Sequence, residues 1–472
     1  METAINKKSF SIKDKLGYLF GNFGNDFTFV LASTFLLKFY TDVMAIDAWI
    51  VGIVMMISRF LDAFTDIAMG RICNKSRVTK NGKFKPWILR MCAPVVIASF
   101  LMYQASIADA SMPIKIIWLS VTYILWGSIL YTAINIPYGS MASTISSKPD
   151  DRQSLSTFRT MGGVLASSII SIIVPMIAYD KLTENGVTQS VLNGERFTII
   201  AGVFSVLALI GYILCYFMTT ERIEPKNEEK KQTSIKEMII NTFTNRSLIS
   251  LIVGSIIMLV GQLTLQGMAS YIFPDYYLNP EGQSISTFVM LGATVIAAAI
   301  TKPLVKRFGK AEISVVAVFI SAVFLILQLI LRPDNMYVFI GLQSFVWLGI
   351  GIIMMVTWAL VTDVIDDSEI KYGVREDGSI YAIYSFARKL GQSACSGIQG
   401  GLLSLIGYQV STKNDPDVLN GIFNIATLIP AISMILLGLI LWFWYPLHKK
   451  KVLENVEILR LKHEGENNET NN

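Results

Sequence analysis

The amino-acid sequence predicts an all-α polytopic membrane protein with twelve transmembrane helices in two six-helix pseudo-repeats. Of its 472 residues, 53% are hydrophobic and only 16% are charged, whereas soluble globular domains carry about 25% charged residues. Twelve apolar stretches recur along the chain, and a helix needs about 20 apolar residues to cross a bilayer. A polar segment near the middle of the chain separates six stretches from six.

The expected helices follow in order along the chain. The first begins after Lys15 and ends near Tyr40; it is longer than a signal-peptide core, and no small-residue cleavage site follows it. The other apolar stretches lie near 48–71, 87–107, 114–137, 159–179, 197–219, 249–273, 285–303, 312–331, 337–362, 379–407 and 421–444. We therefore expect, in order, an N-terminus at 1–16, a first half at 17–219, a linker at 220–248, a second half at 249–444 and a tail at 445–472. The polar end of this tail, from Leu453 to Asn472, is expected to be a solvated or frayed extension.

Basic residues indicate the orientation of the helices. They gather after the second, eighth and twelfth stretches: Arg71, Lys75, Arg77, Lys80, Lys83, Lys85, Lys302, Lys306, Arg307, Lys310, Lys449, Lys450 and Lys451. The opposite loops, such as 42–49 and 274–283, contain no Lys or Arg. The positive-inside rule then places both termini and the linker in the cytoplasm, with the helices crossing the cell membrane.

The two halves also resemble each other, because the basic loops at 70–85 and 304–310 occupy equivalent places. A duplicated arrangement of six plus six helices is that of the major facilitator fold, which binds its substrate near mid-membrane. Two interpretations of each basic loop stay open: a topology signal alone, or a gate as well.

The composition excludes several classes of protein. The two histidines, His448 and His463, both lie in the tail. The chain therefore has almost no histidines from which to build the metal site of a zinc hydrolase or a histidine-based catalytic triad. The four cysteines lie far apart without a CxxC motif and are expected to be packing residues. The net charge of +5 is explained by the cytoplasmic loops, so we expect neither nucleic acid nor a cofactor.

Charged residues inside apolar stretches are few, and each is a functional-site hypothesis because burying a charge in hydrocarbon is costly. Helices 7, 8, 9, 10 and 12 carry no acid in their apolar parts. The intramembrane charges we identify are Asp26 in the first helix, Arg59, Asp62 and Asp66 in the second, Arg159 in the fifth, and Arg388 and Lys389 in the eleventh. The first half therefore supplies the acids, and we expect a cation site among helices 1, 2 and 4, with Lys389 reaching towards it.

The second helix carries the densest group. Spacings of three and four residues put Arg59, Asp62 and Asp66 on one helical face. A closed salt-bridge cluster that only fixes helix packing is one interpretation. However, two acids against one base leave a negative charge, which a bound cation or a proton neutralises. The bound cation could be Na⁺ at Asp62 and Asp66.

Two polar stretches supply hydrogen-bonding groups. The fourth helix offers Thr132 and Asn135, and the stretch 21–26 of the first offers Asn22 and Asn25. Such groups suit a polyhydroxylated ligand. The alternative is that they are packing glycines and internally satisfied amides.

The segment 362–378 is dense in charges of both signs and is expected to be a loop after the tenth helix. It is either a solvated loop or a cytoplasmic gate. In a gate its charged residues, among them Asp363, Asp366, Glu369 and Arg375, would pair with basic loops of the other half.

Several motifs together resemble the glycoside–pentoside–hexuronide:cation symporter family, to which melibiose permease belongs. They are Gly24-Asn25-Asp26, Phe39-Tyr40-Thr41-Asp42-Val43, Arg59-Phe60-Leu61-Asp62-Ala63-Phe64-Thr65-Asp66 and Gly82-Lys83-Phe84-Lys85-Pro86-Trp87-Ile88-Leu89. By this resemblance, Asp62, Asp66 and Thr132 match the family's cation site, beside Thr65. Asp26, Arg159 and Lys389 match sugar-site positions, and Lys389 also links the two sites. We add Asn22, Asn25, Asn135 and Ser385 to the substrate set and Arg59 to the gating set.

The chain departs from melibiose permease at four of these positions. Asn135 stands where that protein has an acid, Thr65 where it has an asparagine ligand, and Gly139 and Met354 where it has tryptophans. We expect a substrate other than melibiose, and a bulkier glycoside could use the space at Gly139. Two acids rather than three slightly favour H⁺ over Na⁺, because one carboxylate of a close pair readily takes a proton.

The sequence thus predicts a secondary transporter that imports a glycoside, pentoside or hexuronide with H⁺ or Na⁺, and that catalyses no covalent change. Its partners are the sugar, the coupling cation and the lipid bilayer. A lipid-modifying membrane enzyme would need a nucleophile or metal cluster at a membrane face, and we find none. A non-transporting sugar sensor is the other alternative, and loss of the paired acids would favour it, but both acids are present.

Overall fold

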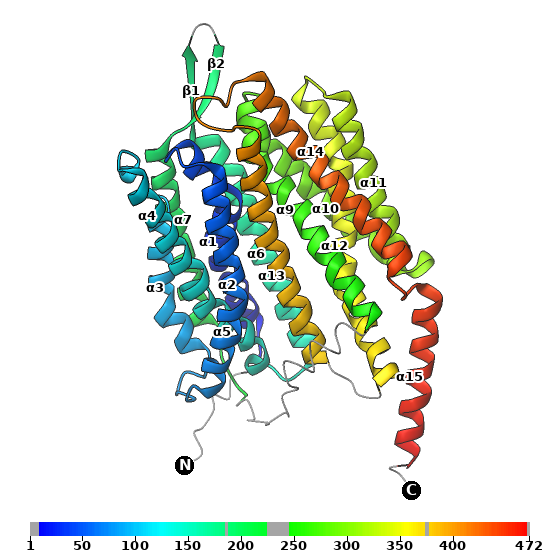
Figure 1. The fold of residues 1–472 in the computed structure, drawn as a ribbon. Coiled ribbons are helices and arrows are strands. Elements are labelled where there is room, and N and C mark those ends of the chain that lie inside the picture. The colour runs from blue at the N-terminus through cyan, green and yellow to red at the C-terminus, as the bar shows by residue number, and fades with distance from the viewer. Residues whose placement is uncertain (1–8, 185–186, 224–244, 373–376, 470–472) are drawn as a thin grey trace. The chain divides into compact units, whose positions relative to one another are not determined.

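The structure is a computed structural model that describes residues 9–184, 187–223, 245–372 and 377–469. It is built almost entirely from helices, drawn in Figure 1. In chain order, the first helices are α1 (Ile12–Asp42), α2 (Ala48–Lys75), α3 (Lys85–Leu101), α4 (Met112–Ile124), the π-helical η2 (Leu125–Tyr131), α5 (Thr132–Ile145), α6 (Pro149–Ile177) and α7 (Gly194–Met218). They are followed by α9 (Arg246–Tyr271), η3 (Ile272–Tyr276), α10 (Glu281–Phe308), α11 (Lys310–Leu331), α12 (Met336–Tyr372), α13 (Asp377–Leu405), α14 (Pro416–Leu439), η4 (Ile440–Trp444) and α15 (Lys449–Glu469).

Each of the twelve apolar stretches coincides with a helical segment. In the described part of the chain, eight segments are long and apolar enough to cross a membrane. They are Met112–Ile145, Asp150–Ile177, Gly194–Met218, Arg246–Tyr276, Glu281–Phe308, Lys310–Leu331, Met336–Tyr372 and Pro416–Trp444. The other four stretches correspond to α1, α2, α3 and α13; α3 has only 17 residues, and the other three carry charged residues inside the stretch.

Polar side chains stabilise several helix starts. Ser11 and Asp14 form a capping box at α1, in which the Ser11 N–H donates to Asp14 Oδ2 at 3.0 Å. Asp47 accepts from the N–H of Trp49 at the start of α2. Gly309 separates α10 from α11 with a φ of +109°, a conformation that residues with a Cβ rarely adopt.

One expectation from the sequence is wrong, and one of two alternatives for another segment is excluded. The segment 362–372 is not a loop, because α12 continues to Tyr372, where Lys371 at the end of the helix pairs with Asp367 one turn earlier at 2.6 Å. The tail is helical rather than frayed, because α15 continues to Glu469, and most of its side chains from Leu453 to Leu461 are exposed, as the alternative of a solvated extension requires. It is anchored by Asn455, whose amide donates to Asp367 at 3.3 Å, and by the Lys449 N–H, which donates to Glu312 at 2.8 Å.

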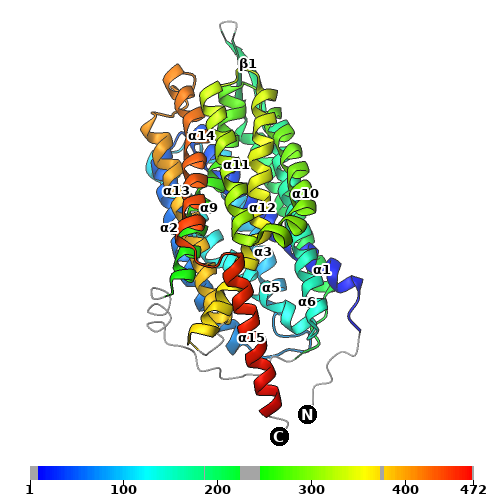
Figure 2. The same ribbon diagram turned by 90° about the vertical axis from the view of Figure 1, so that its right-hand side faces the viewer.

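A β-hairpin between α6 and α7 was not predicted. Strands β1 (Tyr179–Glu184) and β2 (Val187–Leu192) pair antiparallel, from Tyr179↔Leu192 to Glu184↔Val187. The hairpin lies at the end of its unit opposite to the start of α1, as Figures 1 and 2 both show. It therefore marks the side that the charge pattern predicts to be extracellular.

The chain forms two compact packing units. The first contains Met1–Glu228, Gln266–Thr287 and Ser396–Ile422; the second contains Glu229–Leu265, Phe288–Cys395 and Phe423–Asn472. In the first unit, α1 packs along α6 and α7. Two short pieces from the second half of the sequence thus pack with the first half.

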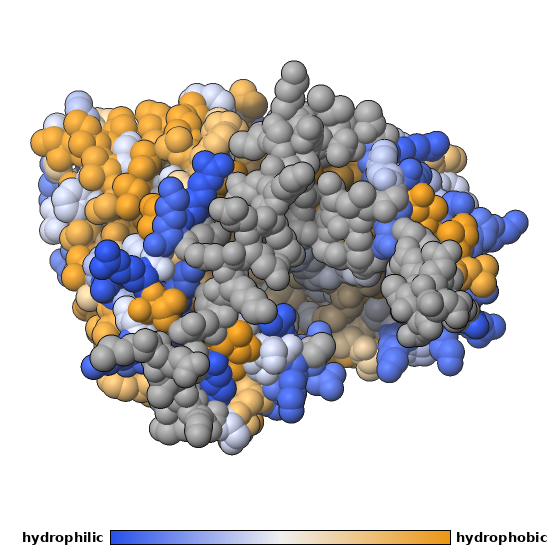
Figure 3. Space-filling view, turned by 90° about the horizontal axis from the view of Figure 1, so that it is seen from below, coloured by the Kyte–Doolittle hydropathy of each residue, from blue (hydrophilic) through white to orange (hydrophobic). Residues whose placement is uncertain are grey.

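Apolar side chains face outward along the helices. On α7, exposed residues recur at spacings of three and four as Ile199, Val203, Val206 and Ile210. In Figure 3, which views the molecule from below, orange apolar side chains gather on the left flank, and blue hydrophilic ones lie among them and on the right. A stripe of this kind is what a lipid-facing helix presents to hydrocarbon.

Candidate functional site

Two carboxylates of α2 meet one hydroxyl of α5. Thr132 Oγ1 lies 3.0 Å from Asp62 Oδ1 and 3.0 Å from Asp66 Oδ1. Asp62 and Thr132 are buried, with exposed fractions of 3% and 2%. The π-helical turn η2 ends at Tyr131, immediately before Thr132; such turns often mark functional sites because they re-aim the following residues.

The hydroxyl geometry limits the charge state of this pair. A threonine hydroxyl has one hydrogen to donate and two lone pairs to accept with. It can donate its hydrogen to one carboxylate. A second ionised carboxylate at the same distance has no hydrogen to donate to the hydroxyl oxygen, so that contact would not be a hydrogen bond. Both short contacts are satisfied when one carboxyl carries a proton, or when a cation bridges the three oxygens. The arrangement therefore fits a proton or a small cation.

Arg59 balances part of the negative charge. Its Nη1 lies 3.4 Å from Asp62 Oδ2, and its guanidinium lies 4.7 Å from the ring centre of Phe29 and 5.5 Å from that of Trp126. Aromatic faces stabilise a buried cation in this way. Arg59 therefore pairs with the candidate cation site through Asp62.

The Thr65 hydroxyl points to its own helix. It donates to the backbone carbonyl of Asp62 at 3.2 Å, as threonines in helices often do. The predicted cation set is thus brought together at Asp62, Asp66 and Thr132, while this contact commits the Thr65 hydroxyl to the backbone. In the described ranges, no group of three or more His, Cys, Asp or Glu side chains could hold a metal ion.

A second polar group joins α1 to α6. The Asn22 amide donates to Asp26 Oδ2 at 2.8 Å, and Asn22 Oδ1 accepts from Arg159 Nε at 3.2 Å. The Arg159 guanidinium stacks on Tyr138, 5.3 Å from its ring centre. In the described part of the first unit, no ion pair joins Arg159 to a carboxylate, so Asn22 relays between the acid and the base.

The space at Gly139, which we expect a bulky glycoside to use, is bordered by a side chain of the protein itself. A Cβ built on Gly139 would lie 3.7 Å from Arg159 Nη1, which is an ordinary van der Waals distance. A small side chain at position 139 would therefore fit beside the guanidinium of Arg159, which borders this space.

Asn25 and Asn135 form a third contact, from α1 to α5. Asn25 Nδ2 donates to Asn135 Oδ1 at 3.3 Å, and the Tyr212 hydroxyl of α7 donates to Asn25 Oδ1 at 2.9 Å. Tyr212, which the sequence analysis did not identify, thereby fixes which way the Asn25 amide faces. No local pattern distinguishes it from the other tyrosines in the chain.

Two glycines of α6 allow this helix to pack closely against α1, where Asn22 and Asp26 lie. A Cβ on Gly163 would lie 2.3 Å from Asp26 Oδ2 and 2.7 Å from Asn22 Nδ2, whereas one on Gly162 would lie 2.2 Å from the backbone oxygen of Leu19. Side-chain tips can move and backbone cannot. The two positions should therefore respond differently to alanine.

We expect Gly163→Ala to fold but to bind sugar at least about tenfold more weakly, because the new methyl displaces the Asn22–Asp26 pair; a shift of about 1.4 kcal/mol suffices. Gly162→Ala should instead lower stability, by about 1–3 kcal/mol for overpacking. Thermal unfolding and equilibrium binding on purified protein separate the two effects. Gly70→Ala is the matched control, because nothing lies within 4 Å of its Cβ position; equal sugar affinity in Gly163→Ala and this control would contradict the expectation.

The remaining predicted residues lie in the second unit. Ser385 and Lys389 lie on α13, and Asp363, Asp366 and Glu369 lie on α12. Asp363 pairs with Lys310 of the same unit at 2.5 Å, and Asp367 accepts from Ser247 at 2.6 Å. Arg375 lies outside the described residues.

Sequence reasoning also missed Lys38, a fully buried lysine on α1 (0% exposed). It lies inside the apolar run Phe35–Tyr40. A charged residue inside an apolar stretch is a functional-site hypothesis, so the criterion that identified Asp26 also applies to Lys38.

A family model described as MFS/sugar transport protein matches residues 17–449. The chain belongs to this family. It is 31% identical over 459 residues to an uncharacterized symporter, YjmB, of Bacillus subtilis (strain 168), with 97% of each chain covered. It is 29% identical over 444 residues to the glucuronide carrier protein homolog of Escherichia coli (strain K12), covering 93% of this chain and 94% of the relative.

Among solved structures, the chain resembles the D-xylose-proton symporter, with a TM-score of 0.62 and 14% identity, covering 92% of this chain and 97% of that one. At this identity the likeness concerns the fold alone. The predicted major facilitator fold and the family resemblance are confirmed. The protein is a multi-pass membrane transporter of the sugar-transport type, not an enzyme.

Proposed function

We propose that this transporter imports a sugar or glycoside together with a cation, by alternating access across the cytoplasmic membrane. The observation that carries the proposal is the pair of carboxylates, Asp62 and Asp66, bridged by one hydroxyl of Thr132. The Asn22–Asp26–Arg159 group lies in the same packing unit. A transporter needs both kinds of group if cation and sugar are to depend on each other.

The chemistry of the Asn22–Asp26–Arg159 group indicates the substrate class. The Asp26 carboxylate can accept hydrogen bonds from sugar hydroxyls, which are stronger than neutral ones because the acceptor is charged. Among the described residues of its unit, Arg159 forms no ion pair with a carboxylate, and guanidinium binds carboxylates in bidentate geometry. An acidic sugar such as a hexuronide fits this pair best, in line with the name of the glucuronide carrier relative.

The coupling ion is H⁺ rather than Na⁺ in our proposal. The single Thr132 hydrogen can be donated to only one of the two carboxylates, and a proton between Asp62 and Asp66 would satisfy the other contact. Sodium would need several oxygen ligands, whereas the contacts of this group bring together three side-chain oxygens, those of Asp62, Asp66 and Thr132. One proton needs only the two carboxylates and the hydroxyl.

Transport by purified protein in sealed vesicles tests the proposal. Counterflow with labelled sugars should be supported best by acidic sugars, with neutral glycosides weaker. Uptake of that sugar should fall as external pH rises, stay unchanged by sodium at fixed pH, and alkalinise the medium when sugar is added. Sodium stimulation without alkalinisation would overturn H⁺ as the ion, and counterflow with none of the sugars would overturn sugar transport itself.

A further inference from the structure

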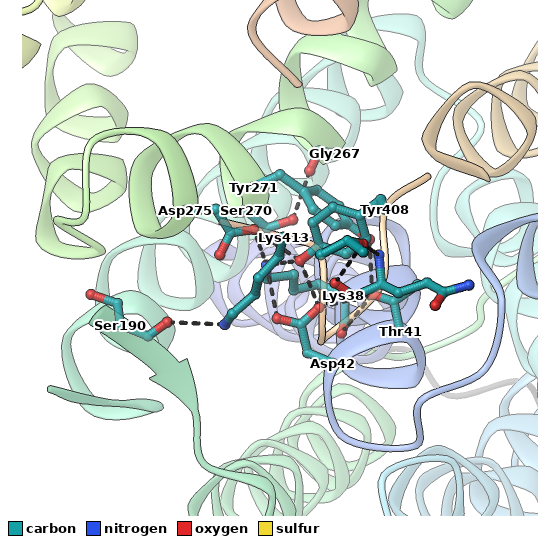
Figure 4. Close-up of polar contacts among 12 residues, drawn as sticks. Lys38, Thr41, Asp42, Ser190, Gly267, Ser270, Tyr271, Asp275, Tyr408 and Lys413 are labelled. Atoms are coloured by element: carbon teal, nitrogen blue, oxygen red, sulfur yellow. Dashed lines mark hydrogen bonds and ion pairs between the residues drawn. The ribbon is translucent and has the colours of Figure 1, made fainter. Parts of the chain in front are cut away.

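A buried cluster of charged and aromatic side chains lies at the hairpin end of the first unit. It contains Lys38 and Asp42 of α1, Tyr271 and Asp275 at the end of α9 and η3, and Tyr408 after α13, as Figure 4 shows. Lys38, Tyr271, Asp275 and Tyr408 are each at most 2% exposed. No role in binding sugar or cation has been assigned to any of these residues.

Lys38 holds the cluster together. Its ammonium group bonds to Asp275, lies 2.6 Å from the Tyr408 hydroxyl and pairs with Asp42 Oδ2 at 2.9 Å. Asp275 and Tyr408 accept hydrogen bonds from this ammonium group, and Asp42 Oδ2 adds an ion pair. The same group lies 4.5 Å from the ring centre of Tyr271 and 5.1 Å from that of Tyr408, so aromatic faces replace water around the charge.

Tyr408 links the two acids. Its hydroxyl accepts from Lys38 and can donate to Asp42 Oδ1 at 2.8 Å or to Asp275 Oδ2 at 2.9 Å. Burial raises the pKa of this phenol well above its usual range, and the nearby carboxylates add to the effect. Because it stays protonated, it remains a donor to the acids.

The hairpin is tied to the same place. The Lys413 ammonium, which lies beside the cluster in Figure 4, donates to the Ser190 carbonyl at 3.4 Å. The Ser190 hydroxyl donates to the carbonyl of Leu278, two residues after η3, at 3.3 Å. The strand β2 is thus joined to both pieces of the second half that pack in this unit, Gln266–Thr287 and Ser396–Ile422.

Helices α2 and α13 are also in close contact within this unit. A Cβ on Gly52 would lie 2.8 Å from the Cα of Gly400, and one on Gly397 would lie 2.7 Å from the sulfur of Met56. The Ser404 hydroxyl near the end of α13 donates to Asp47 at 3.2 Å. Glycines that let helices touch in this way leave no room for a sugar between them.

We propose that the Lys38 cluster is a latch that holds the transporter closed on its extracellular side. Lys38 and Asp42 belong to the first six-helix half of the sequence, whereas Tyr271, Asp275 and Tyr408 belong to the second. Opening to the outside by movement of one half against the other separates Lys38 from Asp275 and Tyr408. The latch therefore sets how often the outward-open state forms. The inference rests on transport by alternating access, but its test needs no sugar.

The test measures access to a cysteine placed in the α2–α13 seam. Met56→Cys is introduced into a chain whose four native cysteines are replaced by serine, and a membrane-impermeant thiol reagent is added from outside. The latch is removed with Lys38→Met and Asp275→Asn together, which deletes one base and one acid so that the net charge of the cluster stays the same. We expect the reagent to label this variant at least about tenfold faster than the parent, because the outward-open fraction rises.

Arg196→Gln is the matched control. Arg196 pairs with Asp180 at 2.7 Å, on the same side of the unit, but both residues belong to the first half. Its labelling rate should equal that of the parent. Unchanged labelling in the folded double variant would overturn the latch.

A second measurement leaves the latch residues intact in case the double variant does not fold. Oxidising an Asp47→Cys, Ser404→Cys pair should join α2 to α13, stop labelling at position 56, and release it again with reductant. Labelling that continues at the parental rate after the disulfide forms would also overturn the proposal. Faster labelling of the latch variant in a protein that moves no sugar would support the latch and overturn the proposed function.

Discussion

Uphill accumulation of sugar should be abolished in Asp66→Cys and Asp62→Cys, while the protein stays inserted in the membrane. Each substitution removes one of the two carboxylates that share Thr132, and without the ion site no gradient can drive the sugar. The two differ in a side effect. Asp62→Cys leaves Arg59 without its carboxylate, and breaking one side of a buried pair costs about 3–5 kcal/mol. Asp66→Cys is therefore the cleaner test.

The measurement is the ratio of internal to external sugar in energised vesicles, with counterflow as the companion assay. We expect the ratio in Asp66→Cys to fall to that of equilibration. Asp109→Cys is the control, since Asp109 is exposed after α3 and its loss should leave the ratio unchanged. Accumulation in Asp66→Cys equal to that of the parent would show that the cation site is wrongly placed.

The helices and the cation group were predictable because their signals are local. A span needs an apolar run of fixed length, and spacings of three and four residues put Asp62 and Asp66 on one face. Thr132, 66 residues away from Asp66, could be added only through the resemblance to a family. Local periodicity cannot report such a distant contact.

The Lys38 cluster was missed for the same physical reason. The lysine is visible in its apolar run, but its partners Asp275 and Tyr408 lie 237 and 370 residues further along the chain. Asp275 was assigned to a loop, because the apolar signal of its helix fades before η3. The charged segment 362–372 was misassigned because a run of acidic residues is typical of a solvated loop. The helix can carry these acids because Lys310, Ser247 and Asn455, which are distant in the sequence, form ion pairs and hydrogen bonds with Asp363 and Asp367.

Sugar binding, rather than ion coupling, should be lost in Asp26→Asn. The neutral amide loses about two charge-assisted hydrogen bonds to sugar hydroxyls, worth about 3–6 kcal/mol. This corresponds to about two to four orders of magnitude in the dissociation constant. The amide keeps one oxygen that can still accept from the Asn22 amide, as Asp26 Oδ2 now does at 2.8 Å, and it presents an N–H₂ donor in place of the second carboxylate oxygen.

Equilibrium binding of a neutral and an acidic sugar to the purified variants separates the roles of this acid and of Arg159. Asp26→Asn should weaken both sugars, because both present hydroxyls to the carboxylate. Arg159→Gln should weaken the acidic sugar far more, because only that sugar loses an ion pair. Ser33→Ala serves as the control on α1, since the Ser33 hydroxyl donates to the Val30 carbonyl of its own helix at 3.2 Å. If Asp26→Asn binds both sugars as tightly as this control, the carboxylate does not contact the substrate, and Arg159 alone would have to recognise it.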